Sequence, residues 1–179
     1  MKFAPLILML TLATATAHAA PDSFMNVLVN PLALLAGPNV QVDFRVSDNW
    51  TVGPQLLYIN RTLGDYDIHA FSAGMNATYY YDKVFTSGWY TQGGLGYSAV
   101  KLTAGRTTNS EAYSSTNQVY LHGMGGYHWF LGDFNLRLGA GLTAGVGHSE
   151  HRDGNGNETG NGPSAPIGLA AEASLGWTF

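Results

Sequence analysis

The stretch Pro38-Asn-Val-Gln-Val-Asp-Phe-Arg-Val-Ser47 alternates without interruption between two kinds of residue. Every even position from Pro38 to Val46 is apolar, and every odd position from Asn39 to Ser47 is polar. Successive side chains of a β-strand point to opposite faces, so this alternation predicts a strand with one apolar and one polar face. The same pattern returns at residues 134–147 and 167–179, at the other end of the chain.

Weaker alternation fills the middle of the chain. It predicts strands over 50–60, 68–82, 88–101 and 117–130, and a first strand over about 25–35 that contains Pro31, a residue without a ladder donor. The predicted strands total eight and are joined alternately by short turns (47–49, 82–87, 131–133) and longer loops (61–67, 102–116, 149–165). Only the first connection, at 36–37, departs from this rule. Short turns at one end and long loops at the other are typical of transmembrane barrels. We therefore expect an all-β fold, an eight-stranded antiparallel up-and-down transmembrane β-barrel.

The N-terminus and the composition predict export. Lys2 is followed by an apolar run from Ala4 to Ala17, and Ala17-His18-Ala19 has the small-x-small pattern of a signal-peptidase site. The run is shorter than the roughly 20 residues of a membrane-spanning helix. We expect a cleavable signal peptide over 1–19 and one barrel domain over 20–179; an uncleaved N-terminal anchor is the alternative.

Bulk composition excludes several function classes. The chain has no cysteine, which rules out disulfides and thiolate chemistry, and its formal net charge of −4 gives no electrostatic footprint for nucleic acid. Its 23 glycines argue against a helical bundle, because glycine costs about 1 kcal/mol in a helix interior. We expect no cofactor and no bound metal.

The aromatic residues indicate which way the apolar face points. A soluble eight-stranded barrel would turn that face inward. All four tryptophans lie on the apolar face at the short-turn end, where rings with one wet edge form a girdle at a membrane boundary. The predicted girdle consists of Trp50, Trp89, Trp129, Trp177 and Phe179.

The chain end carries a resemblance to a known class. Leu175-Gly-Trp-Thr-Phe179 resembles the C-terminal strand of bacterial outer-membrane β-barrel proteins, and residues 20–179 resemble the small OmpA/OmpX/OmpW-like barrels. This resemblance implies a bacterial outer-membrane location with the short turns in the periplasm. It also implies contact with lipid and lipopolysaccharide, and recognition of the C-terminal strand by the barrel-assembly machinery. We expect a monomer.

Four charges fall on the polar, inward faces in mid-strand. Closure of the barrel brings their strands together, so we expect Asp43, Arg45, Arg137 and Glu172 to form a salt-bridged network. Further inward polar residues are expected to complete a plug: Gln41, Gln55, Asn76, Tyr90, Gln92, Tyr120 and His122. The alternatives are a narrow passive pore through these groups and a small-ligand cavity above them, where many inward residues are small.

Two motifs raise the question of chemistry. His148-Ser-Glu-His151 suggests a lipid A-modifying, deacylase-like barrel enzyme that uses His148, but adjacent His148 and Ser149 point to opposite faces of a strand. The Asp153–Glu158 stretch spaces oxygens like a calcium loop, yet it lacks the glycine and the distal glutamate of an EF-hand. We therefore expect a non-enzymatic barrel that supports the envelope or presents loops 102–116 and 149–165 to partners.

Overall fold

The computed structural model describes residues 23–31, 37–105, 112–155 and 157–179. The predicted signal peptide lies outside these residues. Within the described part of the chain, no helix combines the length and apolarity that a membrane crossing requires.

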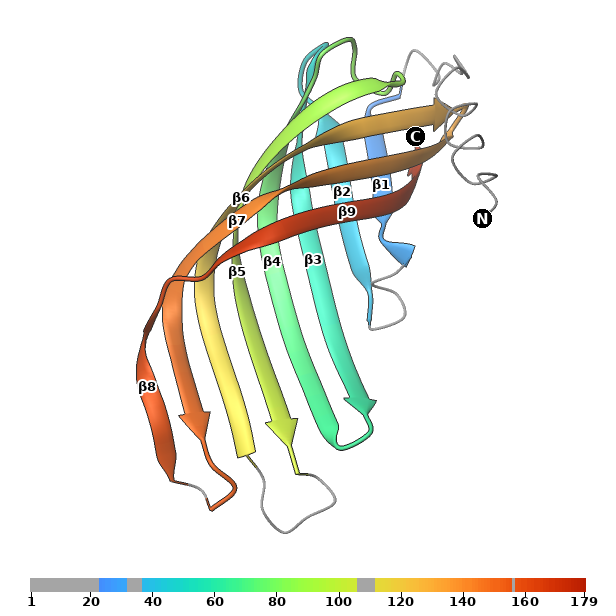
Figure 1. The fold of residues 1–179 in the computed structure, drawn as a ribbon. Coiled ribbons are helices and arrows are strands. Elements are labelled where there is room, and N and C mark those ends of the chain that lie inside the picture. Colours follow the sequence, from blue (N-terminus) through green and yellow to red (C-terminus); the bar gives the residue numbers. More distant parts are fainter. Residues whose placement is uncertain (1–22, 32–36, 106–111, 156) are drawn as a thin grey trace, which may run out of the picture.

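The described residues form one antiparallel sheet that closes on itself (Figure 1). Its ring follows the order β6-β5-β4-β3-β2-β1-β9-β7, and β7 pairs with β6 to complete it. The eight ring strands are therefore joined to their neighbours on both sides, while β8 pairs with the far part of β7. The strands are β1 (Met25–Val29), β2 (Asn39–Arg45), β3 (Trp50–Leu63), β4 (Tyr66–Tyr80), β5 (Gly88–Ala104), β6 (Ala112–Leu131), β7 (Phe134–Arg152), β8 (Glu158–Ser164) and β9 (Ile167–Thr178).

One end of the ring, which we call the turn end, holds the short connections. The β2–β3, β4–β5 and β6–β7 turns lie there, close to the C-terminus (Figure 1). The β6–β7 turn is tightest: Gly132 has a φ of 72°, a left-handed conformation that glycine adopts without steric cost. The ring is sealed at this end, where the amide N–H of Phe24 donates to the carbonyl of Phe179 at 2.9 Å.

The opposite end, the hairpin end, differs from the sequence prediction. Residues 61–67 and much of 149–165 are not loops, because β3 and β4 stay paired up to Leu63 and Tyr66 and β7 runs to Arg152 against β8. Pairing with a neighbouring strand overrides the weak strand propensity of the Gly-Asp-containing 61–67 segment and of the Gly- and Asn-rich 149–165 segment. In the predicted 102–116 loop, β5 likewise extends to Ala104 and β6 begins at Ala112, with residues 106–111 between them outside the description.

The first hairpin is shorter than the other strands. β1 ends at Val29 instead of continuing to about residue 35, since Pro31 cannot donate to a ladder; residues 32–36 are not described. β1 pairs with β9 over Asn26–Val29, and β2 pairs with β3 over Asn39–Arg45. Every strand of the ring thus contributes to the turn end, whereas β3 to β8 alone extend to the hairpin end (Figure 1).

The two faces of the sheet have opposite polarity. Apolar side chains point away from the ring, for example Leu56 with 54% and Leu169 with 89% of its surface exposed. Charged and amide side chains point inward and are buried, including Asp43 and Arg137. The alternation predicted from the sequence is therefore present, with the apolar face outside.

Candidate functional site

Three charged side chains meet inside the ring, and we call them the ion cluster. Arg137 of β7 lies between Asp43 of β2 and Glu172 of β9. Its Nη1 donates to Asp43 Oδ2 at 3.1 Å, its Nε donates to Glu172 Oε1 at 2.7 Å, and its Nη2 lies 2.5 Å from the same oxygen. The Arg137 side chain is fully buried. Ion pairs of this kind are retained inside proteins when further hydrogen bonds satisfy the charges.

Neutral groups complete the coordination of both carboxylates. Gln41 donates to Asp43 Oδ1 at 2.7 Å. Ser174 donates to Glu172 Oε1 at 2.8 Å, and the Tyr90 hydroxyl donates to Oε2 at 3.1 Å. The Arg137 guanidinium also lies 5.2 Å from the centre of the Tyr90 ring, a cation–π distance.

Arg45, the fourth residue of the predicted network, is placed differently. It lies at the end of β2, one inward position nearer the turn than Asp43. Its Nη2 forms an ion pair of 2.8 Å with Asp48 in the β2–β3 turn, where the Asp48 side chain is 77% exposed. The alternation of the sequence predicts the face of the sheet on which Arg45 lies, but not how close to the end of the ring it lies. At that end, Asp48 in the turn is the acidic partner within reach.

A chain of amides and hydroxyls continues from the ion cluster toward the hairpin end. Gln41 donates to Gln92 at 3.4 Å, and Gln92 contacts Nε2 of His122 at 3.3 Å. Gln55 donates to the hydroxyl of Tyr120 at 2.8 Å. The inward residues expected to fill the interior are thus connected to one another, and Asn76 donates to Gln55 at 2.9 Å.

A second buried polar group lies on the turn-end side of the ion cluster. Asn135 donates to Asn26 at 2.8 Å, and His128 Nε2 lies 2.9 Å from Asn135 Oδ1. The hydroxyl of Tyr80 lies 3.1 Å from His128 Nδ1, which suits a neutral imidazole that donates at Nε2 and accepts at Nδ1. The alternation of residue types places these side chains inside the ring, but no other feature of the sequence marks them as a group.

The β4–β5 turn closes the interior at the turn end. Val84 and Phe85 are buried and pack with Tyr80 and Phe130 in the one apolar cluster found among the described residues. Phe85 has a φ of 60°, so its backbone is left-handed, which costs a residue with a Cβ about 1–2 kcal/mol. Packing of the phenylalanine ring against Phe130, 6.1 Å away, holds this conformation.

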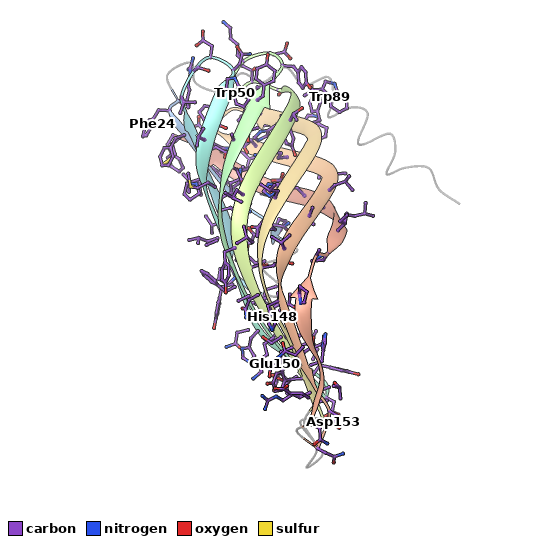
Figure 2. The ribbon with its side chains drawn as sticks, turned by 90° about the vertical axis from the view of Figure 1, so that its left-hand side faces the viewer. Phe24, Trp50, Trp89, His148, Glu150 and Asp153 are labelled. Carbon is purple, nitrogen blue, oxygen red and sulfur yellow. The ribbon has the colours of Figure 1, made fainter. Side chains whose placement is uncertain are left out.

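Aromatic side chains surround the outside of the ring at the turn end. Trp50, Trp89, Trp177 and Phe179 each have close to half or more of their surface exposed. Trp50, Trp89 and Trp177 contact aromatic rings on neighbouring strands, with centroids 5.1–5.4 Å apart, and Trp129 contacts Tyr127 of its own strand at 4.7 Å. These residues form what we call the aromatic belt, part of which Figure 2 shows: Trp50, Tyr79, Trp89, Tyr127, Trp129, Phe134, Trp177 and Phe179.

The outer surface changes from apolar to polar at a constant level beyond the belt. The outward positions from Trp50 to Tyr58 on β3 are apolar, and those from Trp89 to Tyr97 on β5 are uncharged, with Thr91 and Gly93 between Trp89 and Leu95. Polar residues then follow side by side on the same face, and the strand registers align them across the sheet: Asn60, His69, Lys101, Ser115 and Glu150. The ring therefore has an apolar outer band that is limited at both ends.

The histidine motif lies near the hairpin end (Figure 2) and does not assemble a His–Ser pair. His148 points outward and contacts Asn161 of β8. Ser149 points to the opposite face, where its hydroxyl lies 2.9 Å from that of Thr116. Glu150 accepts from the Tyr113 hydroxyl at 2.8 Å and from Arg152 Nε at 2.9 Å, and these contacts hold the pKa of its carboxyl below the ordinary value.

The Asp153 loop satisfies its own oxygens. Asp153 Oδ1 accepts the backbone N–H groups of Asn155 and Asn157, both at 2.9 Å. These local bonds lower the pKa of the Asp153 carboxyl and make the segment a closed turn. Among the described residues, no group of three or more histidine or acidic side chains is arranged to hold a metal ion.

Comparisons with known proteins give no relative for this chain. No family model, no curated protein and no solved structure matches it. The resemblance to small outer-membrane barrels consequently stays a prediction from the sequence.

Proposed function

We propose that the closed ring is an eight-stranded β-barrel that spans the bacterial outer membrane, has no enzymatic activity and carries a plugged interior. The observation that carries this proposal is the inverted polarity of the sheet. Leucine, valine and isoleucine side chains cover the outside, whereas Arg137 and Asp43 are buried inside. Soluble monomeric proteins rarely expose so continuous an apolar surface to water, whereas the hydrocarbon core of a membrane favours one.

The dimensions of the apolar band support a membrane location. A transmembrane β-strand needs about 9–11 residues when it is tilted by about 45°. The uncharged outward segments from Trp50 to Tyr58 and from Trp89 to Tyr97 fit this length. The aromatic belt borders the band on one side and the polar row from Asn60 to Glu150 borders it on the other, as expected for two membrane–water boundaries.

The interior supports a structural role over conduction. The side chains of the ion cluster extend from β2, β7 and β9 into the interior of the ring, where Arg137 is fully buried. Nearer the turn end, the Asn26–Asn135–His128 group and the packed Phe85 turn add two further layers. An eight-stranded barrel is just wide enough for its side chains to fill it, so these layers together form a plug.

The hairpin end is the surface we propose for partners outside the cell. The β7–β8 hairpin extends from Glu150 in the polar row to Arg152 and Glu158 beyond it, and Arg152 forms ion pairs with both glutamates. In this orientation the turn end and the C-terminal strand face the periplasm. Lipid and lipopolysaccharide surround the band, and the Trp177–Phe179 end is the segment offered to the barrel-assembly machinery.

Two measurements on the expressed chain test the membrane proposal. We expect the protein in the outer-membrane fraction, with different gel mobility before and after boiling, because a closed barrel resists detergent until it is heated. Recovery in a soluble fraction, together with identical mobility of boiled and unboiled samples, would contradict the proposal.

Planar-bilayer recordings test the plug separately. We expect no unitary current from the folded protein at any applied voltage, since the interior is blocked at three levels. Reproducible single-channel steps would instead favour the narrow pore.

A further inference from the structure

A shallow groove of about 210 Å³ lies on the outer face of the sheet, on strands β3 to β6. Pockets that enclose a drug-sized molecule have volumes of roughly 300–1,000 Å³. The groove therefore fits one end of a larger molecule, whose other end extends over the outside of the ring.

The strand register explains where the surface is hollow. Four outward side chains lie side by side in one row across β3 to β6: Tyr58, Phe71, Ala99 and Asn117. The next row toward the hairpin end has polar side chains: His69, Lys101 and Ser115. Ala99 has the smallest side chain of the two rows, so the surface is lowered between Phe71 and Asn117, beside Lys101.

The two sides of the groove differ in polarity. On the side of the turn end, Tyr58 and Phe71 have 50% and 44% of their surface exposed, and they continue the apolar outer band. On the side of the hairpin end, His69 and Lys101 belong to the polar row that limits the band. A molecule that contacts both sides is therefore amphiphilic, with an apolar part along the band and a polar part at the polar row.

The polar side of the groove carries positive charge and hydrogen-bond donors. Among the described residues that line it, Lys101 has the only formal charge, and none is acidic. The Lys101 ammonium lies 4.8 Å from the centre of the Tyr113 ring and forms no hydrogen bond or ion pair with a described residue. Asn117 accepts the Tyr97 hydroxyl at its Oδ1 at 3.2 Å, which leaves its amide nitrogen as a donor toward a ligand.

Acidic side chains on the same outer face are engaged with other partners. Glu150 accepts from Tyr113 and Arg152, and Asp67 accepts from Thr62. Neither carboxylate lines the groove. The groove therefore complements an anion, and a lysine ammonium binds phosphate as a compact point charge.

We propose that this groove binds a phosphorylated lipid, with the phosphate at Lys101 and Asn117 and an acyl chain on Tyr58 and Phe71. The inference rests on the membrane location proposed above, in which this end of the apolar band meets the lipid headgroups on the side of the hairpin end. A free phosphate would leave the apolar side of the groove uncovered, whereas an acyl chain removes that side from contact with water.

The test is a titration of the folded protein in a non-ionic detergent, followed by the amide NMR signals of Ala99 in the groove and Lys83 at the turn end. Three probes are compared: dihexanoyl phosphatidic acid, dihexanoylglycerol, which lacks the phosphate, and inorganic phosphate, which lacks the chains. We expect phosphatidic acid to shift the Ala99 signal saturably, to leave the Lys83 signal in place, and to bind more tightly than the other two. Equal affinity for either of the other probes would overturn the proposal, and so would equal shifts at Ala99 and Lys83.

Lysine variants locate the phosphate. Lys101→Gln is expected to weaken the binding of phosphatidic acid about fivefold, since a lysine near anionic headgroups contributes about that factor. Lys101→Arg keeps the charge and should retain binding, and Lys83→Gln, the matched control in the exposed β4–β5 turn, should change it by less than about twofold. Equal losses in Lys101→Gln and Lys83→Gln refute the site. A chain recovered in the soluble fraction contradicts the membrane location itself, whereas a membrane-located chain without a saturable shift at Ala99 contradicts this site alone.

Discussion

Removing the positive charge of Arg137 is the most informative perturbation of the interior. Arg137→Met keeps most of the side-chain length and takes away the guanidinium that bridges Asp43 and Glu172 at 3.1 and 2.5 Å. Two buried carboxylates then share one site without a protein cation.

The size of the effect follows from burial. Breaking a buried ion pair by removing one partner costs about 3–5 kcal/mol, a large part of the roughly 5–15 kcal/mol that stabilises a typical domain. Arg45→Met is the matched control, since Arg45 pairs with the largely exposed Asp48 and such pairs contribute about 0–1 kcal/mol. Adding Asp43→Asn and Glu172→Gln to Arg137→Met should recover most of the loss, because no charge then stays unpaired.

Urea unfolding in detergent micelles or lipid, followed by tryptophan fluorescence, measures these differences. The four tryptophans are distributed over β3, β5, β6 and β9, so their combined fluorescence reports unfolding of the whole ring. If Arg137→Met and Arg45→Met lower the stability equally, or if the triple variant is no more stable than Arg137→Met, the ion cluster does not hold the ring together as described.

Three other perturbations address the outer band, the turn plug and the surface cluster. Leu95→Arg, on the exposed outer face, should lower the free energy of unfolding in lipid by about 2–4 kcal/mol. Thr103→Arg, beyond the band, should change it by about 0.5 kcal/mol or less. Similar losses for both variants in urea unfolding would count against a lipid-facing band. Phe85→Gly should lose about 0.5–1 kcal/mol less stability than Phe85→Ala, because glycine adopts the positive φ freely, and equal losses by the same assay would remove the argument for backbone strain. Tyr113→Phe should raise the pKa of Glu150 toward its ordinary value in a carboxyl NMR titration, since the Tyr113 hydrogen bond is the main cause of its lowering. In the wild type the lowered pKa of Glu150 stabilises the hairpin when the pH lies above the pKa of an ordinary glutamate, and this stabilisation is lost as the pH falls through the pKa of the folded protein. An unchanged titration of Glu150 in Tyr113→Phe would exclude the hydrogen bond as the cause.

The alternation of residue types was sufficient to predict the sheet and its faces. Positions such as Val42 and Asp43 lie on opposite sides because the strand period is two, and no tertiary information is needed to predict it. Strand order followed from short turns. The meeting of Asp43, Arg137 and Glu172 then followed from closure of the ring, since β2, β1, β9 and β7 are consecutive neighbours.

Features that depend on height along a strand or on packing could not be predicted in the same way. Arg45 has the parity of an interior residue, yet one step toward the turn brings it to Asp48. The inward packing of Phe85 depends on a left-handed backbone that a six-residue polar and apolar turn does not reveal. The paired hairpins at 61–67 and 149–165 were missed because the Gly64-Asp65 pair in the first and the Gly- and Asn-rich composition of the second occur both in loops and in strands that a neighbour supports.

The seam between β1 and β9 has a consequence for the order of folding. It joins segments from opposite ends of the described chain, and the Asp43–Arg137 pair joins residues 94 positions apart. The hairpins from β3 to β8 require only local contacts and can form early, whereas the seam has a high loop-closure cost and comes late. Pairing of β7 with β9 already brings Arg137 beside Glu172, but Asp43 on β2 stays apart from them until the seam closes. The Asp43–Arg137 contact, and with it the full burial of the ion cluster, is therefore a late step that depends on closure of the ring.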